Sequence, residues 1–419
     1  MLFRSHWGEL GDGNSQLQRQ WRLTPASISL LGSSKVVDIA VGFGHTLVLI
    51  EDGTVRAWGL NNRGQLGDGT TIDRLTAPVS VPLPRRAVAI ATGGFHSLAL
   101  LEDGTVFSWG STDNGALGRS SRSFAEPRQI ILLLGAKQIV ASDHTSFALL
   151  SDGTVRGWGA NRYGQLGLGH TSDRDWPVLI ANLANISQIT ACGDHTLAVS
   201  TGGQVSSWGS NWSNQLGRDS YTLGMDRSVW YSPAAVPAMT AVRSAHCSRN
   251  ASLAIRCDDS VWTWGNNYRG NLGDGSSISN RVTPQPVPGL ENAKTAVAGY
   301  ASFFILLRDG RLMGWGYNDE AQLGDGTRAD RVTPVLLMQV DEAPATGAHP
   351  MAGTTPSRIG CLDIASGCYM DVSVTPSGLY RVVSSRTPHD AVWIDALQYG
   401  RLTNLRWRRT RDGYPLWGD

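Results

Sequence analysis

The chain has 419 residues, and its 36 Lys and Arg against 35 Asp and Glu leave a formal net charge of +1. A chain this close to neutral has no overall field for nucleic acid or a membrane surface, so composition argues against both as partners. The longest apolar stretches, 130–136 and 296–307, are too short to span a bilayer.

The first residues begin in the middle of a pattern. The sequence Gly8–Gly13 (GELGDG) matches Gly64–Gly69 (GQLGDG), with nothing before it to supply the first half of that unit. The start of the chain has no charged region followed by a long apolar run, so it is not a secretory signal peptide. We therefore expect a cytoplasmic protein, with export without a recognisable signal peptide as the alternative.

Complete repeats follow at a spacing of about 50 residues, which indicates a solenoid, an array or a propeller. Each repeat has a strand that ends in a Trp-Gly pair, and the six tryptophans are Trp58, Trp109, Trp158, Trp208, Trp264 and Trp315. Each also carries an apolar segment, and these are 46–50, 97–101, 146–150, 196–200, 252–255 and 303–307. Asp-Gly pairs such as Asp52-Gly53 follow most of these segments and predict tight hairpins. Because the segments are apolar on both faces, each strand must be covered on both sides, and we expect an all-β fold.

A last unit begins near residue 360 and stops halfway. Ala365–Tyr369 matches Val297–Ala301, Ser377-Gly378 marks a turn, and 379–383 reads as a strand with no Trp-Gly after it. We therefore predict a seven-bladed β-propeller over 1–383, in which 1–35 completes the blade begun by 360–383. Such closure removes exposed sheet edges.

Three regions depart from the repeat. The segment 217–250 is lengthened and contains Tyr221, Met225, Trp230 and Tyr231. The segment 339–360 is rich in Pro, Ala, Gly and Thr and is typical of a surface excursion. The non-repeat tail, 384–419, is predicted to hold one short helix over 389–399 and then a cluster of arginines around a tryptophan, Arg401, Arg406, Trp407, Arg408 and Arg409.

The repeat resembles that of the regulator of chromosome condensation (RCC1) superfamily. The resemblance is carried by Gly42 with His45-Thr46-Leu47, Asp52-Gly53-Thr54-Val55, Trp58-Gly59-Leu60-Asn61 and Gly64–Gly67, and it covers about 1–383. The Gly-Asp-Gly-Thr loops are similar to those of bacterial members. The resemblance implies a seven-bladed propeller, and in one branch nucleotide exchange on a Ran-type GTPase with binding to chromatin. This chain lacks that branch's basic N-terminal tail.

The polar motifs have both a structural and a ligand-binding interpretation. His45, His96, His144 and His195 recur at one phase of the repeat, with a one-residue shift at His144, and the favoured interpretation is structural hydrogen bonding rather than a ring of metal ligands. The Gly-Asp-Gly sequences lack the alternating acidic ligands and terminal Glu of an EF-hand and are interpreted as turns. The five cysteines contain no C-x-x-C and are expected to be reduced, with a disulfide between Cys361 and Cys368 as an alternative in an exported protein.

No phosphate-binding loop, nucleophile elbow or zinc-protease motif occurs, so we expect neither catalysis nor a cofactor or metal. The predicted function is that of a monomeric protein-binding scaffold that uses loops on one face and the rim. Trp212 joins the residues of the lengthened segment and the tail cluster as the predicted contacts. The alternative is a guanine-nucleotide exchange factor for a Ran- or Rab-like small GTPase, acting through the 218–232 loop.

Overall fold

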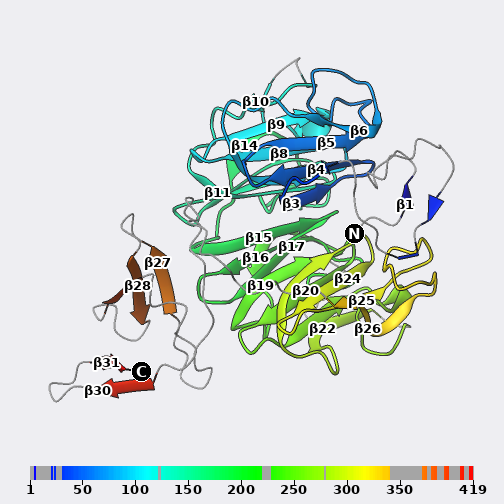
Figure 1. Cartoon of the computed structure of the whole chain (residues 1–419). Coiled ribbons are helices and arrows are strands. Elements are labelled where there is room, and N and C mark those ends of the chain that lie inside the picture. Colours follow the sequence, from blue (N-terminus) through cyan, green and yellow to red (C-terminus); the bar gives the residue numbers. More distant parts are fainter. Residues whose placement is uncertain are drawn as a thin grey trace. The chain divides into compact units, whose positions relative to one another are not determined.

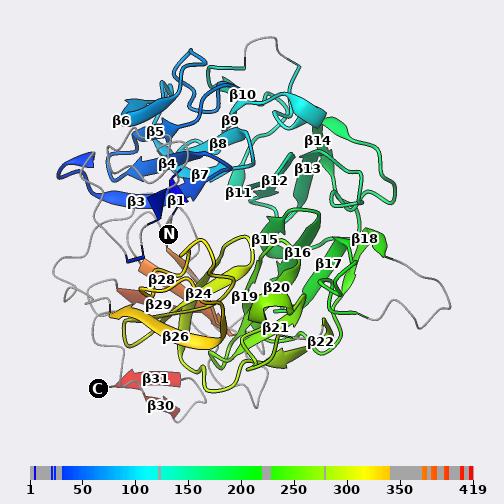
Figure 2. The ribbon, with the colours of Figure 1, turned by 90° about the vertical axis from the view of Figure 1, so that its right-hand side faces the viewer.

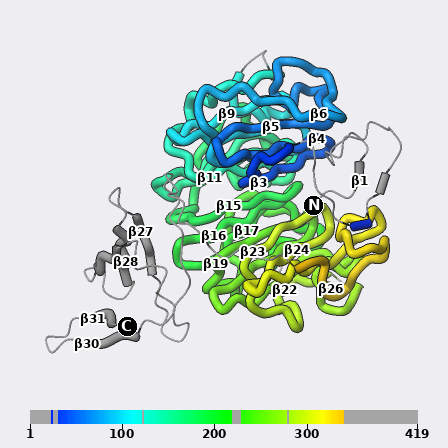
Figure 3. Tube along the Cα trace, in the orientation of Figure 1, coloured from blue at the N-terminus to red at the C-terminus, as the bar shows by residue number. Residues whose placement is uncertain are grey.

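The computed structural model describes residues 4–5, 20–21, 23–24, 31–120, 124–218, 228–277 and 280–339, and the backbone of five strands between 370 and 418. The chain forms two compact units, Met1–Gly347 and Ala348–Asp419. Figure 3 traces the described part of the chain.

The first unit contains six four-stranded antiparallel sheets, here called blades 1 to 6, which follow one another in chain order (Figures 1 and 2). Blade 1 comprises β3 (Val36–Val41), β4 (His45–Ile50), β5 (Val55–Gly59) and β6 (Arg74–Ser80). Blade 2 comprises β7 (Ala87–Thr92), β8 (His96–Leu101), β9 (Val106–Gly110) and β10 (Arg128–Gln129), with a 3₁₀ turn, η2, at Asp113–Gly115. Blade 3 comprises β11 (Ala136–Ser142), β12 (Thr145–Leu150), β13 (Val155–Gly159) and β14 (Arg174–Leu179).

The remaining blades repeat this arrangement. Blade 4 comprises β15 (Ile186–Cys192), β16 (His195–Ser200), β17 (Val205–Ser210) and β18 (Val229–Ala235). Blade 5 comprises β19 (Val242–Cys247), β20 (Ala251–Arg256), β21 (Val261–Gly265) and β22 (Arg281–Pro286), with η3 at Tyr268–Gly270. Blade 6 comprises β23 (Ala293–Ala298), β24 (Ser302–Leu307), β25 (Arg311–Gly316) and β26 (Arg331–Gln339). The predicted apolar segments are therefore confirmed as the second strand of each blade.

The first strand of each blade contacts the first strand of the next, so these strands are the innermost. The second strands are buried almost throughout, as in β4 and β8, because neighbouring blades cover both of their faces. The six repeat tryptophans are fully buried at the ends of the third strands. The core is therefore a series of layers between successive blades.

Each blade has two distinct ends. The loops between strands one and two and between strands three and four emerge at the same end, because His45 and Arg74 both pair with Gly59. We call this end the loop face. The Asp-Gly hairpins and the connectors between blades lie at the other end, the turn face. At a hairpin such as Asp52-Gly53, Gly53 has a φ of +84° and the Asp52 carboxylate accepts a hydrogen bond from the Thr54 amide at 2.9 Å.

Buried polar groups join neighbouring blades in a repeated way. His45 Nε2 lies 3.1 Å from Ser97 Oγ, and Ser97 Oγ donates in turn to the Gln65 carbonyl at 2.9 Å. The same carbonyl accepts a hydrogen bond from Trp109 Nε1 at 2.9 Å. His96 and His195 make matching contacts with Ser146 and Ser252, at 2.8 and 3.1 Å. These histidines are therefore structural, whereas His144 lies one residue off this phase, where Thr145 pairs with Gly159.

The predicted seventh blade is wrong: the propeller has six blades. The strands expected to begin that blade, β27 (Met370–Val374) and β28 (Leu379–Ser384), form a three-stranded sheet with β29 (Ala391–Asp395) from the tail. The third strand thus comes from a neighbouring part of the chain rather than from the distant N-terminus, and β29 replaces the predicted helix. Near the N-terminus, β1 (Arg4–Ser5) pairs with β2 (Gln20–Trp21).

A disulfide joins two blades. Cys192, at the end of β15, and Cys247, at the end of β19, are bonded with their Cα atoms 5.7 Å apart. The expectation of reduced thiols is therefore wrong for this pair, because the repeat places both residues on adjacent innermost strands. Cys361 and Cys368 lie outside the described residues.

Candidate functional site

The loop face is a connected surface rather than a set of independent loops. In each blade an amide at the end of the third strand, or just after it, donates to a carbonyl in the loop before the second strand. Examples are Leu60 N to Gly44 O at 2.7 Å and Ser210 N to Asp194 O at 2.8 Å. The inner and outer loops of one blade are thus held together, and the backbones that carry their side chains have fixed positions.

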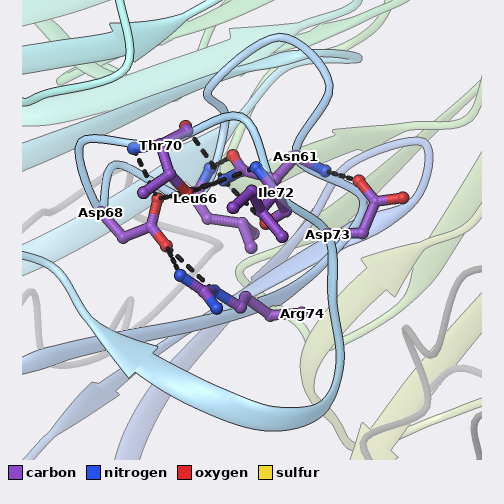
Figure 4. A network of polar contacts seen from close by, with 7 residues as sticks. All are labelled: Asn61, Leu66, Asp68, Thr70, Ile72, Asp73 and Arg74. Atoms are coloured by element: carbon purple, nitrogen blue, oxygen red, sulfur yellow. Dashed lines mark hydrogen bonds and ion pairs between the residues drawn. The ribbon is translucent and has the colours of Figure 1, made fainter.

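The outer loop of blade 1 is organised by two buried or half-buried side chains, Asn61 and Asp68 (Figure 4). Asn61 Nδ2 donates to Asp68 Oδ1 at 3.1 Å and to the Ile72 carbonyl at 3.2 Å, while its Oδ1 accepts from the Leu66 amide at 2.9 Å. Asp68 also accepts from Thr70 Oγ1 at 2.7 Å, and its Oδ2 forms an ion pair with Arg74 at 2.9 Å. Burial raises the pKa of the Asp68 carboxyl, but hydrogen bonds from Thr70, Arg74 and Asn61 outweigh it, so the pKa lies below its usual value.

The same network recurs around Asp274 in blade 5 and Asp325 in blade 6. In the Gly-Asp-Gly loops that the structure describes, the carboxylates are thus engaged by the protein itself, which agrees with their interpretation as turns. In the described part of the chain there is no group of three or more His, Cys, Asp or Glu side chains arranged to hold a metal ion. The hydrogen bonds and ion pairs of these loops supply a rigid frame for the loop face.

The inner loops carry the charged and aromatic groups nearest the propeller axis. Phe43 and Phe95 meet edge to face with their ring centroids 5.5 Å apart, and Arg249 Nη1 donates to Tyr300 Oη at 2.9 Å. Burial raises the pKa of Asp194, with a further contribution from the negative charge of Asp143, while Arg249 and Arg162 act in the opposite direction.

Exposed aromatic rings are concentrated on the loop face of the later blades. Trp212 is 68% exposed, and Tyr268 and Tyr300 are exposed to a similar degree. Arginines lie over several of these rings: Arg249 is 5.2 Å from the Tyr300 centroid, and Arg269 is 5.2 Å from that of Tyr268. Arg269 is also fixed by an ion pair with Asp330 at 3.0 Å. A rigid surface of Trp, Tyr and Arg has the composition of protein-interface hot spots.

The structure separates the predicted contact residues into three groups. Trp212 is on the loop face, and Trp230 and Tyr231 lie in β18 at the rim of the same blade. The Arg218 guanidinium lies 4.2 Å from the Trp230 centroid, and the Tyr231 ring packs against the backbone at Gly164 of blade 3. Tyr221, Met225 and Arg401 lie outside the described residues. Arg406, Trp407, Arg408 and Arg409 form strand β30 (Arg406–Arg409), which pairs with β31 (Pro415–Gly418) in the second unit.

Three aromatic residues of the loop face, Phe43, Tyr268 and Tyr300, were missed from the sequence. Tyr268 occupies the same phase after its Trp-Gly pair as Trp212, and Tyr300 the same phase as Phe43. Alignment of the repeats on their tryptophans would have placed them on one surface. The prediction instead followed the lengthened segment, which drew attention to blade 4 alone.

The fold and this surface define a class: a repeat β-propeller with a rigid, aromatic loop face. No helix in the described part of the chain is long and apolar enough to cross a membrane. A family model for the RCC1-like domain matches residues 4–301, and one for the RCC1 repeat matches residues 309–349. The chain therefore belongs to the RCC1-like repeat family, as its motifs predicted.

Relatives and solved structures agree with this assignment. The chain is 31% identical over 366 residues to the human E3 ubiquitin-protein ligase HERC2, covering 84% of the chain and 7% of HERC2. It is 31% identical over 351 residues to the Arabidopsis thaliana ultraviolet-B receptor UVR8, covering 81% of the chain and 65% of UVR8. The chain thus spans less than two thirds of the length of either relative.

Among solved structures, human WBSCR16 is similar with a TM-score of 0.69 and 27% identity, over 77% of this chain and 87% of that one. Prp20p from Saccharomyces cerevisiae, whose structure was described with its binding to Gsp1p and histones, gives a TM-score of 0.70 at 21% identity over 80% of this chain and 85% of that one. The second likeness shows the fold alone.

Proposed function

We propose that this protein is a binding scaffold that holds a protein partner on its loop face, with Trp212, Tyr268 and Tyr300 as the main contacts. The carrying observation is the exposure of these rings on loops whose backbones are fixed by the hydrogen bonds described above. A loop whose backbone is already fixed loses little conformational entropy on binding, so more of the contact energy appears as affinity. Trp230 and Tyr231 extend the same surface toward the rim of blade 4.

The experiment replaces the anchors with residues that the repeat already accepts. The double variant Trp212→Asn with Tyr268→Asn installs the residue that blade 1 has at this position, Asn62. The full chain serves as bait for a pull-down from the organism that encodes it, with captured proteins quantified by mass spectrometry. We expect at least tenfold loss of the specific partner, with the melting temperature unchanged because both side chains are exposed.

A matched control is Leu336→Ala, which removes an exposed apolar side chain from the outer strand of blade 6. The control should retain the partner. Equal capture by all three proteins would show that the loop face is not the binding surface. Purified small GTPases are tested alongside, and accelerated nucleotide release from one of them would instead establish the exchange-factor alternative.

A further inference from the structure

The hairpin at the end of the second unit has a charge unlike that of the whole protein. β30 (Arg406–Arg409) and β31 (Pro415–Gly418) pair antiparallel and form a two-stranded sheet of their own (Figure 1). Residues 401–419 hold five arginines and two aspartates, which gives this segment a net charge of +3. The net charge of the full chain is only +1. Positive charge is therefore concentrated at this hairpin.

The register of the hairpin decides which of these residues share a face. Successive residues of a strand alternate between its two faces, and directly paired residues of an antiparallel ladder lie on the same face. Trp407 pairs with Trp417, and Arg409 follows Trp407 on that face. Arg406 and Arg408 lie on the opposite face. One face thus combines two tryptophans with an arginine, and the other holds two arginines.

This distribution favours one kind of anionic ligand over the others. An amphipathic element that lies in a membrane surface places its apolar residues on one face and its charges on the other. In β30 both faces contain arginine, so neither face suits burial among lipid chains. A nucleic acid strand instead offers a phosphate and a planar base in every nucleotide, and these are the groups that arginine and tryptophan bind.

We propose that the β30–β31 hairpin is a binding site for single-stranded nucleic acid. Trp407 and Trp417 provide the surface on which bases stack, and the arginines of both faces neutralise phosphates. A duplex fits less well, because its bases stack on one another and expose only their edges in the grooves. The cross-strand tryptophan pair therefore selects a single strand over a duplex.

The near-neutral composition of the whole chain does not oppose this site. At physiological ionic strength, interactions between exposed charges are largely screened beyond about 8 Å. The affinity of the hairpin for phosphates is then set by the charges of the segment 401–419 rather than by the total charge of the protein. The hairpin shares no residue with the loop face, so the two binding activities are separable by mutation.

The test measures binding of the full chain to a fluorescein-labelled oligothymidylate of twelve nucleotides, by fluorescence anisotropy at several salt concentrations. The main variant is Arg406→Gln with Arg408→Gln, which removes both arginines from one face of the hairpin. Each phosphate contact to a single strand contributes about −0.7 to the slope of log affinity against log salt concentration. We therefore expect at least tenfold weaker binding and a slope that is shallower by about 1.4. Arg406→Lys with Arg408→Lys keeps both charges and should keep the slope.

A second pair of variants tests base stacking. Trp407→Leu keeps an apolar residue in the hairpin but removes the aromatic ring, and it should weaken binding at least fivefold. Trp407→Phe keeps an aromatic ring and should retain most of the affinity. The matched control is Arg85→Gln with Arg311→Gln, which also removes two charges, from propeller side chains that are 60% and 48% exposed. This control should bind the oligonucleotide like the wild type.

Several results would overturn the proposal. One is unchanged affinity in the glutamine variant or in Trp407→Leu, and another is equal affinity of the wild type for a DNA duplex of the same length. Tighter binding to vesicles that contain phosphatidylserine would assign the hairpin to a membrane surface instead. Tighter binding to polyglutamate would assign it to an acidic protein.

Discussion

The repeated histidine is the clearest case of a conspicuous residue with a structural role. The Ser97 hydroxyl has one hydrogen and donates it to the Gln65 carbonyl, so its oxygen accepts from His45 Nε2 and fixes the neutral tautomer with the proton on Nε2. His45 Nδ1 is buried without a partner among the described residues. A second proton on the ring would therefore have no acceptor.

This geometry predicts acid sensitivity. Burial lowers the pKa of His45 to about 3, that of His96 to about 3 and that of His195 to about 4, from an ordinary value of 6.5. The unfolded chain then binds more protons than the folded chain between these values, so stability is complete above pH 6.5 and falls as the pH drops toward 3. At pH 5 each histidine should cost about 2 kcal/mol.

The free energy of unfolding, measured by urea titration at pH 7 and pH 5, checks this expectation. His45→Gln keeps a donor near Ser97 but does not titrate, so the difference between the two pH values should shrink by about 2 kcal/mol. An unchanged difference in this variant would show that His45 is protonated in the folded protein. The comparison is between two pH values of one variant, so any loss of packing cancels.

At the scale of the element, the loop between the third and fourth strands depends on one buried carboxylate. Asp325 is only 5% exposed, accepts from Thr327 Oγ1 at 2.8 Å and from Asn318 Nδ2 at 3.0 Å, and pairs with Arg331 at 2.6 Å. Asp325→Ala removes the shared acceptor of these three donors. We expect a loss of about 2–3 kcal/mol in the free energy of unfolding, measured by urea titration.

Asp309 in the same blade provides a matched control. It also pairs with an arginine, Arg311, at 2.8 Å, but its side chain is 52% exposed. Solvent screens this pair, so Asp309→Ala should cost clearly less than Asp325→Ala. Similar losses in the two variants would mean that burial of Asp325 adds nothing to its contribution.

The sequence was sufficient for the strands and their turns. The predicted second strand of blade 1, 46–50, differs by one residue from β4, because an apolar run and an Asp-Gly pair specify a hairpin locally. Trp212 could be identified as a contact residue because other repeats have polar residues at the same position. The Cys192–Cys247 bond depends on which blades are adjacent, and this became visible only in three dimensions.

At the scale of the whole molecule, the number of blades could not be obtained from motif counting. The half-motifs at 8–13 and 365–383 were joined on the assumption that matching fragments complete one sheet. The structure pairs Val383 with Ala391 instead, a contact between residues close in the chain. Closing such a short loop costs far less entropy than joining the two ends of the chain, and a repeat pattern carries no information about that competition.

The disulfide between blades 4 and 5 gives a prediction about the stability of the whole propeller and about the cellular compartment of the protein. Cys192 and Cys247 are 55 residues apart, so the bond restricts the unfolded chain and should stabilise the protein by about 4 kcal/mol. Peptide mapping under non-reducing conditions should recover the linked pair, and Cys192→Ser with Cys247→Ser should lower the melting temperature of the oxidised protein. Dithiothreitol should also lower the melting temperature of the wild type, but it reduces the disulfide of Cys257 as well, so it does not isolate the contribution of the Cys192–Cys247 bond.

The informative comparison is therefore between the wild type and the double variant, each under oxidising conditions. Disulfides persist in oxidising compartments and are rare in a reducing cytoplasm. Protein isolated from its own cells with alkylation of free thiols should thus carry the bond if the chain is exported, and two alkylated cysteines if it is cytoplasmic. Two outcomes together would contradict a structural role for the bond. One is that both cysteines are recovered alkylated from native protein, and the other is that the wild type and the double variant have equal melting temperatures. The geometry argues for that role, because the bond links the innermost strands at the place where two adjacent blades must stay together.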